Sequence, residues 1–507
     1  MDTEVLARLQ FAFTIMFHYI YPPLSIGLGV ALVIMEGIWL RTGNVLYHNM
    51  ARFWTRIFAL TFSIGVATGI VMEFEFGTNW ATYSRFVGDI FGSALAAEGI
   101  FAFFLESGFL AVLLFGWNKV GPKMHFFATC MVCLGSHFSA VWIVVANSWM
   151  QTPAGYHLVR LNKEGVWERL PADYILQQAD VHNVRAIVDD FWAMVFNPSS
   201  IDRLTHTILG AWMAGAFLVL SISAFYLLRN RHIPFAIASL KVGLAFATVA
   251  TFAQMLSGDA TAKGVVKNQP IKLAAIEGVY KTEPYTPLTL FGWVDPVTEK
   301  VHGPQIPGML SFLCYMDFQK PVKGLHEMPS DEFLLARHPG ATPEELVQIR
   351  KQYWPRVPLV FQTYHLMIGL GMILLGLVVV GIGLWWMGWL FDTSRAVTRW
   401  YLFALVWSVI LPQVANQAGW LTAELGRQPW VVYEILKTSQ GLSRVVSAEQ
   451  ILFSLITFAF VYVLLFAVFI YLLTRKIQHG PDDGEESEEM PESWKAIIVS
   501  SEQQPRA

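Results

Sequence analysis

Long apolar runs, separated by shorter polar connections, dominate the hydrophobic pattern of this chain. A helix needs about 17 to 25 mostly apolar residues to cross a bilayer. Nine runs meet that requirement, and an odd number places the two termini on opposite sides of the membrane. The pattern therefore predicts nine transmembrane helices, at residues 11–40, 55–76, 93–117, 125–149, 207–228, 234–256, 358–390, 400–424 and 451–474.

Two long polar segments interrupt this series, at residues 151–205 and 257–357. They divide the chain into parts. Residues 1–256 contain the first six helices together with the first polar segment, and residues 358–474 contain the last three helices. Residues 475–507 form a tail rich in aspartate and glutamate, a composition typical of a solvated segment.

Positive charges predict the orientation. Short loops on the cytoplasmic side of a membrane protein carry an excess of lysine and arginine. We therefore expect the N-terminus and both polar segments outside, and the C-terminus in the cytoplasm. The first run starts with Asp2 and Glu4, too acidic for a cleaved signal peptide, so we count it as a helix. The charges follow the odd-numbered helices: Arg41, Arg52, Arg56, Lys119, Lys123, Arg229, Arg231, Arg395, Arg399, Arg475 and Lys476.

Composition agrees with an all-α polytopic membrane protein. Hydrophobic residues make up 54% of the 507 residues and charged residues 14%, against about 25% in soluble domains. Mean hydropathy is +0.46. The formal net charge of −3 gives no reason to expect a nucleic-acid partner. Cys130 and Cys133 fall within a predicted helix, where we expect packing rather than redox chemistry.

Four potential metal ligands fall toward the outer ends of predicted helices. His18 lies two turns into the first, His206 opens the fifth, Met367 lies two turns into the seventh, and Glu424 closes the eighth. Histidine with methionine is a recurrent axial pair for heme iron. A single histidine in a membrane helix more often bonds to a neighbouring helix, so the expectation rests on the shared depth of all four.

Residues 423–430, Ala-Glu-Leu-Gly-Arg-Gln-Pro-Trp, end the eighth run with a carboxylate and a guanidinium. Charged groups at a membrane edge are costly. Glu424 could bind a metal while Arg427 neutralises acidic groups of the same cofactor. The alternative is a helix end with Trp430 as an interfacial anchor and Arg427 extending toward water.

Glu98 and Glu106 both lie in the third predicted helix. Their separation is about 12 Å along the helix axis and about 80° around it, so one side of the helix carries both. Carboxylates in a membrane are usually protonated, paired or part of a proton relay. His137 and Ser139 of the next helix could extend such a relay.

Over nearly its whole length the chain resembles subunit I of the cytochrome bd family of quinol oxidases. The family's members reduce oxygen to water with electrons from quinol, using three hemes. The matching motifs are RLQFA at 8–12, GVATGIVMEFEFGTNW at 65–80, FVGDIFG at 86–92, FFLES at 103–107, KLAAIE at 272–277 and GWLTAELGRQPW at 419–430.

The resemblance implies three cofactors: a low-spin heme b, a high-spin heme b and heme d. His206 and Met367 would hold the low-spin heme, while His18 and Glu424 would each be an axial ligand of one of the other two. Trp420 and Arg427, in the motif around Glu424, would also contact cofactor. Glu98 and Glu106 would belong to the proton route and the heme pocket.

The resemblance also implies a donor site and partners. Lys272 and Glu277 would belong to the quinol-oxidising segment 257–357, in the outer loop and away from the membrane-embedded candidates. The partners would be subunit II, possibly a small single-span subunit, quinol, oxygen and membrane lipids. The location would be the bacterial cytoplasmic (inner) membrane.

Two departures from better-known members resemble the cyanide-insensitive branch. The chain has His365-Leu-Met367 where those members have Arg-x-Met, and Asn416-Gln417-Ala-Gly-Trp420 where they have Val-Glu-Ala-Gly-Trp. A second high-spin heme b could therefore replace heme d. His365 could replace the missing arginine as a partner of a heme propionate, and a histidine making one ordinary hydrogen bond is the alternative.

Two other functional classes remain open at this point. A proton-coupled transporter would account for Glu98 and Glu106 but not for the histidine, methionine and glutamate set. A membrane cytochrome b that passes quinol electrons to another protein would account for His206 and Met367 but not for His18 and Glu424. The sequence favours an electrogenic oxidase that takes protons from the cytoplasm without a pump.

Overall fold

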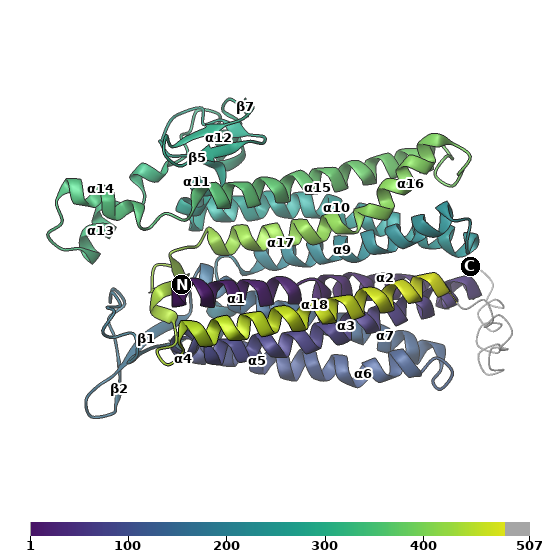
Figure 1. Cartoon of the computed structure of the whole chain (residues 1–507), viewed down its shortest axis with the longest axis horizontal. Helices are drawn as coiled ribbons and strands as arrows, with labels where there is room; N and C mark the ends of the chain where they lie inside the picture. Colours follow the sequence, from purple (N-terminus) through teal and green to yellow (C-terminus); the bar gives the residue numbers. More distant parts are fainter. Residues whose placement is uncertain (1, 482–507) are drawn as a thin grey trace, which may run out of the picture.

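The computed structural model describes residues 2–481. Long helices lie side by side along the longest axis, with the smaller elements at the end that holds the N-terminus (Figure 1). We call this the N-terminal end of the bundle, and the end with the short connections the C-terminal end. The predicted acidic tail, beyond residue 481, lies outside the described residues.

Among the described residues, eight helices are long and apolar enough to cross a membrane, and a ninth span results if a pair of helices bent by 41° counts as one. All nine predicted runs thus coincide with helices, and the structure supports eight or nine spans. The first is broken after its fourth turn, and the third contains a π-helical turn. The elements are α1 (Thr3–His18) with α2 (Tyr21–Thr42), α3 (Val45–Thr78), α5 (Gly88–Glu98) with η1 (Gly99–Phe103) and α6 (Phe104–Phe115), α7 (Pro122–Gln151), α9 (Ser200–Leu228), α10 (Ile233–Asn268), α15 (Val357–Trp386), α16 (Ala396–Ser408) with α17 (Ile410–Leu425), and α18 (Ala448–His479).

Several helices are longer than the apolar runs that predicted them. α10 continues through Asn268, so the second polar segment starts later than the expected residue 257. α7 reaches Gln151, and α9 starts at Ser200, before the expected end of the first polar segment. Hydropathy marks where the membrane ends, whereas backbone hydrogen bonding continues wherever a neighbouring element covers the helix.

The centre of the bundle is α9, which packs on α2, α7, α10 and α16. Gly27 and Gly215 allow α2 and α9 to approach closely, because a Cβ on Gly27 would lie 2.7 Å from the Cα of Gly215. Small residues at helix contacts are how membrane helices gain van der Waals packing without a hydrophobic driving force.

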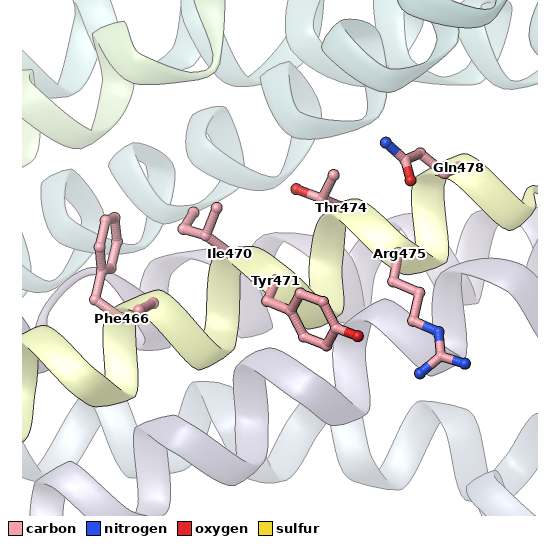
Figure 2. A pocket seen from close by; sticks show the side chains of 7 residues that line it. Phe466, Ile470, Tyr471, Thr474, Arg475 and Gln478 are labelled. Carbon is pink, nitrogen blue, oxygen red and sulfur yellow. The ribbon is translucent and has the colours of Figure 1, made fainter.

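α18 lies on the outside and exposes most of its apolar side chains. Figure 2 shows a groove along it, in which apolar groups near Phe466 give way to polar groups toward Arg475. Such a change from apolar to polar is expected where a helix leaves the hydrocarbon region.

Both polar segments fold against the N-terminal end (Figure 1). The first forms a three-stranded antiparallel sheet in the order β2-β1-β3 and then the short α8. The second forms α11, two small two-stranded sheets, α12 and two further helices. Bounds are β1 (Tyr156–Leu161), β2 (Trp167–Arg169), β3 (Val184–Val188), α8 (Phe191–Val195), α11 (Pro270–Glu277), β4 (Leu288–Thr289) paired with β7 (Gln305–Ile306), β5 (Trp293–Asp295) paired with β6 (Lys300–His302), α12 (Met309–Tyr315), α13 (Asp331–Arg337) and α14 (Pro343–Lys351).

Candidate functional site

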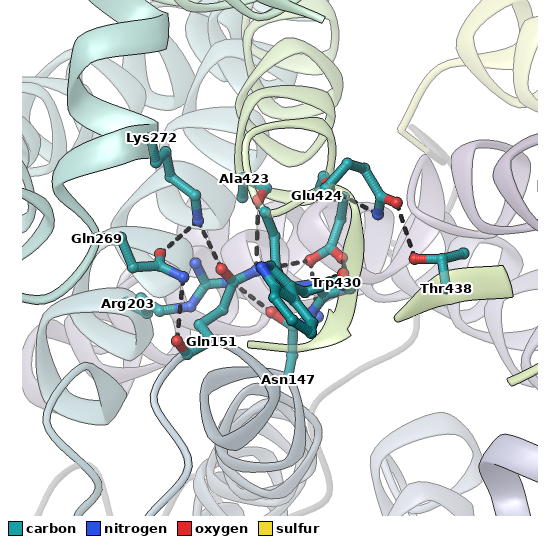
Figure 3. A network of polar contacts seen from close by, with 11 residues as sticks. Asn147, Gln151, Arg203, Gln269, Lys272, Ala423, Glu424, Trp430 and Thr438 are labelled. Carbon is teal, nitrogen blue, oxygen red and sulfur yellow. Dashed lines mark hydrogen bonds and ion pairs between the residues drawn. The ribbon is translucent and has the colours of Figure 1, made fainter. Parts of the chain in front are cut away.

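Glu424 lies at the end of α17, where α7, α9 and α11 also meet. Its Oε2 accepts a hydrogen bond of 2.5 Å from Arg427 Nη2. Its Oε1 accepts from Asn147 Nδ2 at 3.0 Å and from Gln151 Nε2 at 3.4 Å. Figure 3 shows Asn147 and Gln151, both of α7, beside Glu424 of α17. The carboxylate is thus held in one orientation by donors from two elements.

Two guanidinium groups flank Glu424. Arg427 is 4% exposed and donates to the carbonyl of Trp430 at 3.2 Å, but its Nη1 is buried with no partner among residues 2–481. Arg203 donates to Asn147 Oδ1 and lies 5.8 Å from the ring centre of Trp420. Within the same residues, Arg203 Nε is also buried without a partner. A buried N–H group without a hydrogen-bond acceptor is costly, and an anionic group could accept from both Arg427 Nη1 and Arg203 Nε.

Lys272 belongs to this same network, so the expectation that it lies away from the membrane-embedded candidates is wrong. Its Nζ donates to Gln151 Oε1 at 2.5 Å and to Gln269 Oε1 at 2.6 Å, and Gln151 in turn contacts Glu424 (Figure 3). Lys272 is only 4% exposed. Burial, with a smaller contribution from the charge of Arg203, holds the pKa of Lys272 well below its usual value.

Glu277 lies at the other end of α11 and faces a different neighbour. It is buried beside Tyr364 of α15, and among the described residues its Oε2 has no hydrogen-bond partner. Burial raises the pKa of Glu277 to about 7, while the hydrogen bond with Tyr364 opposes that shift. Glu277 therefore changes protonation state near neutral pH.

His206 and Met367 approach the centre of the bundle from different helices. His206, in the second turn of α9, has Gln254 Nε2 at 3.2 Å from its Nε2 and 3.3 Å from its Nδ1. A neutral imidazole has only one acceptor nitrogen, and Gln254 Oε1 has no partner in the described part of the chain. Met367 packs on α17, where a Cβ on Gly419 would lie 2.9 Å from its sulfur.

His18 is the last residue of α1, just before the break in the first span. Its Nδ1 lies 3.0 Å from Thr68 Oγ1. The Thr68 hydroxyl donates to the Ile64 carbonyl at 2.8 Å, so it accepts from His18, and Nε2 keeps its lone pair. A second hydrogen bond that fixes the tautomer in this way is typical of a metal-binding histidine.

α1 begins at Thr3, before the apolar run that starts at residue 11, so His18 is the last of 16 residues of its helix. Tyr19 packs edge-on against Trp420, with ring centres 5.5 Å apart. Trp420 precedes Glu424 by one turn, so His18 lies about 6 Å deeper than Glu424. The four candidates therefore share the N-terminal half of the bundle, at depths that differ by about a turn.

His365 is bound on both sides by backbone. Its Nδ1 lies 2.9 Å from the Phe361 carbonyl and its Nε2 lies 3.1 Å from the Thr289 carbonyl. Its ring also stacks on Phe361, with centres 3.9 Å apart. Both carbonyls can only accept, so a neutral imidazole donates to one of them, and through these contacts His365 links α15 to β4 of the second polar segment.

Glu98 and Glu106 both face α7, as their spacing predicted. Ser139 Oγ donates to Glu98 Oε1 at 2.6 Å. Glu106 is buried against Gly135, where a Cβ would lie 2.5 Å from Glu106 Cγ. His137 points elsewhere: it donates from Nδ1 to the Cys133 carbonyl at 2.7 Å and accepts from Trp212 Nε1 at 2.9 Å. It does not extend this route.

Sequence reasoning missed several polar residues at the site. Gln151 connects Glu424 to Lys272, and Asn147 connects Glu424 to Arg203. Outside the site, sequence reasoning also missed Glu36, which forms a buried ion pair with His125 of α7. For Asn147 and Glu36 the available signal was the same one that identified Glu98: a polar or ionisable residue inside an apolar run needs a partner. Gln151 and Arg203 lie in the polar segment 151–205 and gave no such signal. Which partner a polar residue finds depends on helix packing, which the apolar pattern does not contain.

The four potential ligands fit a porphyrin better than a bare metal ion. Within residues 2–481, no three histidine, cysteine, aspartate or glutamate side chains gather closely enough to hold a metal ion. His18, His206, Met367 and Glu424 come from four different helices. A heme supplies four ligands of its own and needs only axial groups and partners for its propionates. Isolated ligands beside unpaired guanidinium nitrogens fit that requirement.

Comparison with known proteins identifies the family. Residues 6–481 match the family described as cytochrome bd terminal oxidase subunit I. The chain is 35% identical to the cytochrome bd ubiquinol oxidase subunit 1 of Bacillus subtilis (strain 168), over 95% of each chain. It is 34% identical to the cytochrome bd-II ubiquinol oxidase subunit 1 of Escherichia coli (strain K12), over 95% of this chain and 97% of that one.

A solved structure agrees with these relatives. The bd oxidase from Geobacillus thermodenitrificans superimposes with a TM-score of 0.78 and 26% identity, over 95% of this chain and 99% of the other. The match extends over the transmembrane helices and both polar segments alike. This chain therefore belongs to the cytochrome bd terminal oxidase subunit I family.

Proposed function

We propose that this chain is the heme-bearing subunit of a terminal oxidase that oxidises quinol and reduces oxygen to water. The observation that supports this best is the set of four isolated ligand side chains, of which Glu424 lies between two guanidinium groups with unpaired N–H donors. The two relatives described above are named as ubiquinol oxidase subunits, which supports quinol as the donor.

Four side chains would hold the hemes. His206 and Met367 would ligate a low-spin heme b, and His18 and Glu424 would each ligate one of two further hemes. These would be a high-spin heme b and either heme d or a second high-spin heme b. Arg427 and Arg203 would neutralise propionates, and Trp420 would pack between Arg203 and Tyr19. When bound, the hemes supply the electron storage and the oxygen-binding iron that this reaction needs.

The chain's own residues would handle quinol and its protons. Lys272 and Glu277 lie at opposite ends of α11, which covers the N-terminal end of the bundle. Lys272 would bind a quinol oxygen, and Glu277 would accept a quinol proton because its pKa of about 7 allows both protonation states at neutral pH. Gln151 and Gln269 orient the Lys272 amine.

Protons for oxygen reduction would come from the cytoplasm. Glu106 and Glu98 would relay them, each held against α7. Because donor and ligands share the N-terminal half of the bundle, electrons would cross little of the membrane. Protons would move against a potential worth about 2.3 kcal/mol per 100 mV for each charge. The enzyme would thus conserve energy without pumping.

Assembly and location follow the same proposal. The relatives are named as subunit 1, which supports a subunit II as partner. A small single-span subunit and lipids would cover further apolar surface. The complex would lie in the bacterial inner membrane, with the N-terminal end of the bundle outside and the C-terminus in the cytoplasm.

One optical experiment separates this function from the two alternatives. The purified, dithionite-reduced complex should show heme bands, part of which shift when carbon monoxide is added, and it should consume oxygen when given quinol. Absence of heme would indicate a transporter. Heme bands with no carbon monoxide shift would indicate a cytochrome that only transfers electrons.

A further inference from the structure

A buried ion pair lies near the C-terminal end of the bundle, far from the ligand residues. Glu36 of α2 and His125 of α7 are 1% and 0% exposed, and His125 Nδ1 lies 2.6 Å from Glu36 Oε1. Thr129, one turn along α7, donates to Glu36 Oε2 at 2.5 Å. None of the motifs or candidate ligands described above includes this pair, and ionisable groups inside a membrane protein usually have a function.

The hydrogen bonds of His125 fix where its protons are. Its Nε2 lies 3.2 Å from the Leu113 carbonyl, which can only accept, so Nε2 carries a hydrogen. The short contact between Nδ1 and the Glu36 carboxylate requires one more proton between the two groups. Glu36 and His125 together therefore hold a proton in addition to the one on Nε2.

His137, on the same helix, provides a contrast. It donates from Nδ1 to a backbone carbonyl and accepts at Nε2 from Trp212, so one ring proton satisfies both contacts. Its Nδ1 also lies 3.9 Å from Cys133 Sγ, and none of these three partners is a carboxylate. Of these two histidines of α7, His125 alone shares a proton with an acid.

The pair lies between the C-terminal end and Glu106. Along α7, Thr129 is seven residues from Ser136, which adjoins Glu106, and along α6, Leu113 is seven residues from Glu106. Two turns of helix correspond to about 10 Å in both cases. On the side of the pair that faces the C-terminal end of the bundle, the ring centres of His125 and Trp117 are 3.9 Å apart. Those of Trp117 and His48 are 5.2 Å apart.

We propose that Glu36 and His125 form the proton-holding site that supplies Glu106 from the cytoplasm. This inference rests on the proposed function, which requires cytoplasmic protons. A proton from cytoplasmic water binds the pair while the shared proton leaves through a short chain of waters to the Glu106 carboxylate, and no electrons move. The titratable or charged groups around the pair are Cys130 of α7 and, beyond Trp117, His48 and Arg52 of α3.

Two variants in the assembled complex separate proton transfer from helix packing. Glu36→Gln removes the acid, and the double variant Glu36→Gln with His125→Gln removes both charges, so that no lone charge is buried. His137→Gln is the matched control, because it changes a half-buried histidine of the same helix that is not paired with a carboxylate. Each is assayed for heme spectra, for electron transfer from reduced hemes to oxygen, and for proton uptake.

The proposal predicts unchanged heme spectra in both variants, with proton uptake and quinol oxidase turnover about 100-fold slower, the low end of the effect of a positioned proton-transfer group. Lowering the pH should restore part of the rate. The control should behave like the wild type. Normal proton uptake in the double variant overturns the proposal. Loss of heme in both variants also overturns it, because the pair would then serve only to hold α2 and α7 together. An unmodified complex that does not reduce oxygen would refute the proposed function instead.

Discussion

At the scale of single residues, burial determines the chemistry of the candidate site. Lys272 and Glu277 occur in a segment whose sequence reads as polar, yet both side chains are buried. One is enclosed by glutamine amides and the other by an apolar surface beside Tyr364. The same residue types in water would neither shift their pKa values nor select a ligand.

Met367 provides the first test of the ligand set. Met367→Leu nearly conserves volume, so the fold should persist, but the low-spin heme should lose its methionine ligand and become high spin or shift to a lower potential. The reduced-minus-oxidised spectrum measures this directly. Met372→Leu, on an exposed position of the same helix, is the control. A low-spin spectrum unchanged in the Met367 variant would remove this residue from the ligand set.

The raised pKa of Glu277 predicts that turnover depends on pH near neutrality. Its pKa is raised to about 7, so it is mostly protonated below that pH and ionised above it. If the ionised form accepts a quinol proton, turnover should rise as the pH increases through about 7. Glu277→Gln should lower turnover and flatten that rise, with all heme bands intact. Glu283→Gln, an exposed glutamate of the same segment, should keep the wild-type profile, and an unchanged profile in the Glu277 variant would contradict the assignment.

At the scale of secondary-structure elements, close contacts between helices position the acidic residues. α6 and α7 can approach because residue 135 has no side chain, and Glu106 occupies the space that a Cβ would need. The π-helical turn η1 lies between Glu98 and Glu106, and both carboxylates still meet α7.

Gly135→Ala should displace Glu106 without changing any titratable group. Alanine favours a helix over glycine by roughly 0.5–1 kcal/mol, so a loss of function would be steric. We expect turnover to fall toward that of Glu106→Gln while the complex still assembles. Gly376→Ala, at a glycine of α15 with open space around it, is the matched control. Turnover equal to the control would show that the position of Glu106 is not critical.

The sequence predicted the elements better than it predicted their ends and contacts. Nine spans could be located because a bilayer imposes a length on each apolar run. The extension of α10 depends on tertiary contacts. The break after His18 precedes Pro22 and Pro23 at the start of α2, and proline breaks a helix without changing its hydropathy. The network joining Lys272 to Glu424 depends on Gln151 and Asn147, whose partners are far away in sequence.

At the scale of the whole molecule, we assign quinol oxidation and heme binding to one end of the bundle and proton entry to the other. The N-terminal end gathers the proposed ligands, the guanidinium groups and the quinol residues. The C-terminal end holds the buried pair of Glu36 and His125, with Glu106 between the two ends. A separation of this kind converts oxygen chemistry into charge movement, because protons travel across the membrane while electrons stay near one side.

Proton uptake by the complex in lipid vesicles tests this account most directly. With quinol as the donor, the wild type should take up protons from the side that faces its C-terminal end, in step with oxygen consumption. Glu106→Gln should abolish both while carbon monoxide still binds the reduced hemes. Uptake from the opposite side, or normal uptake and turnover in the Glu106 variant, would contradict the account.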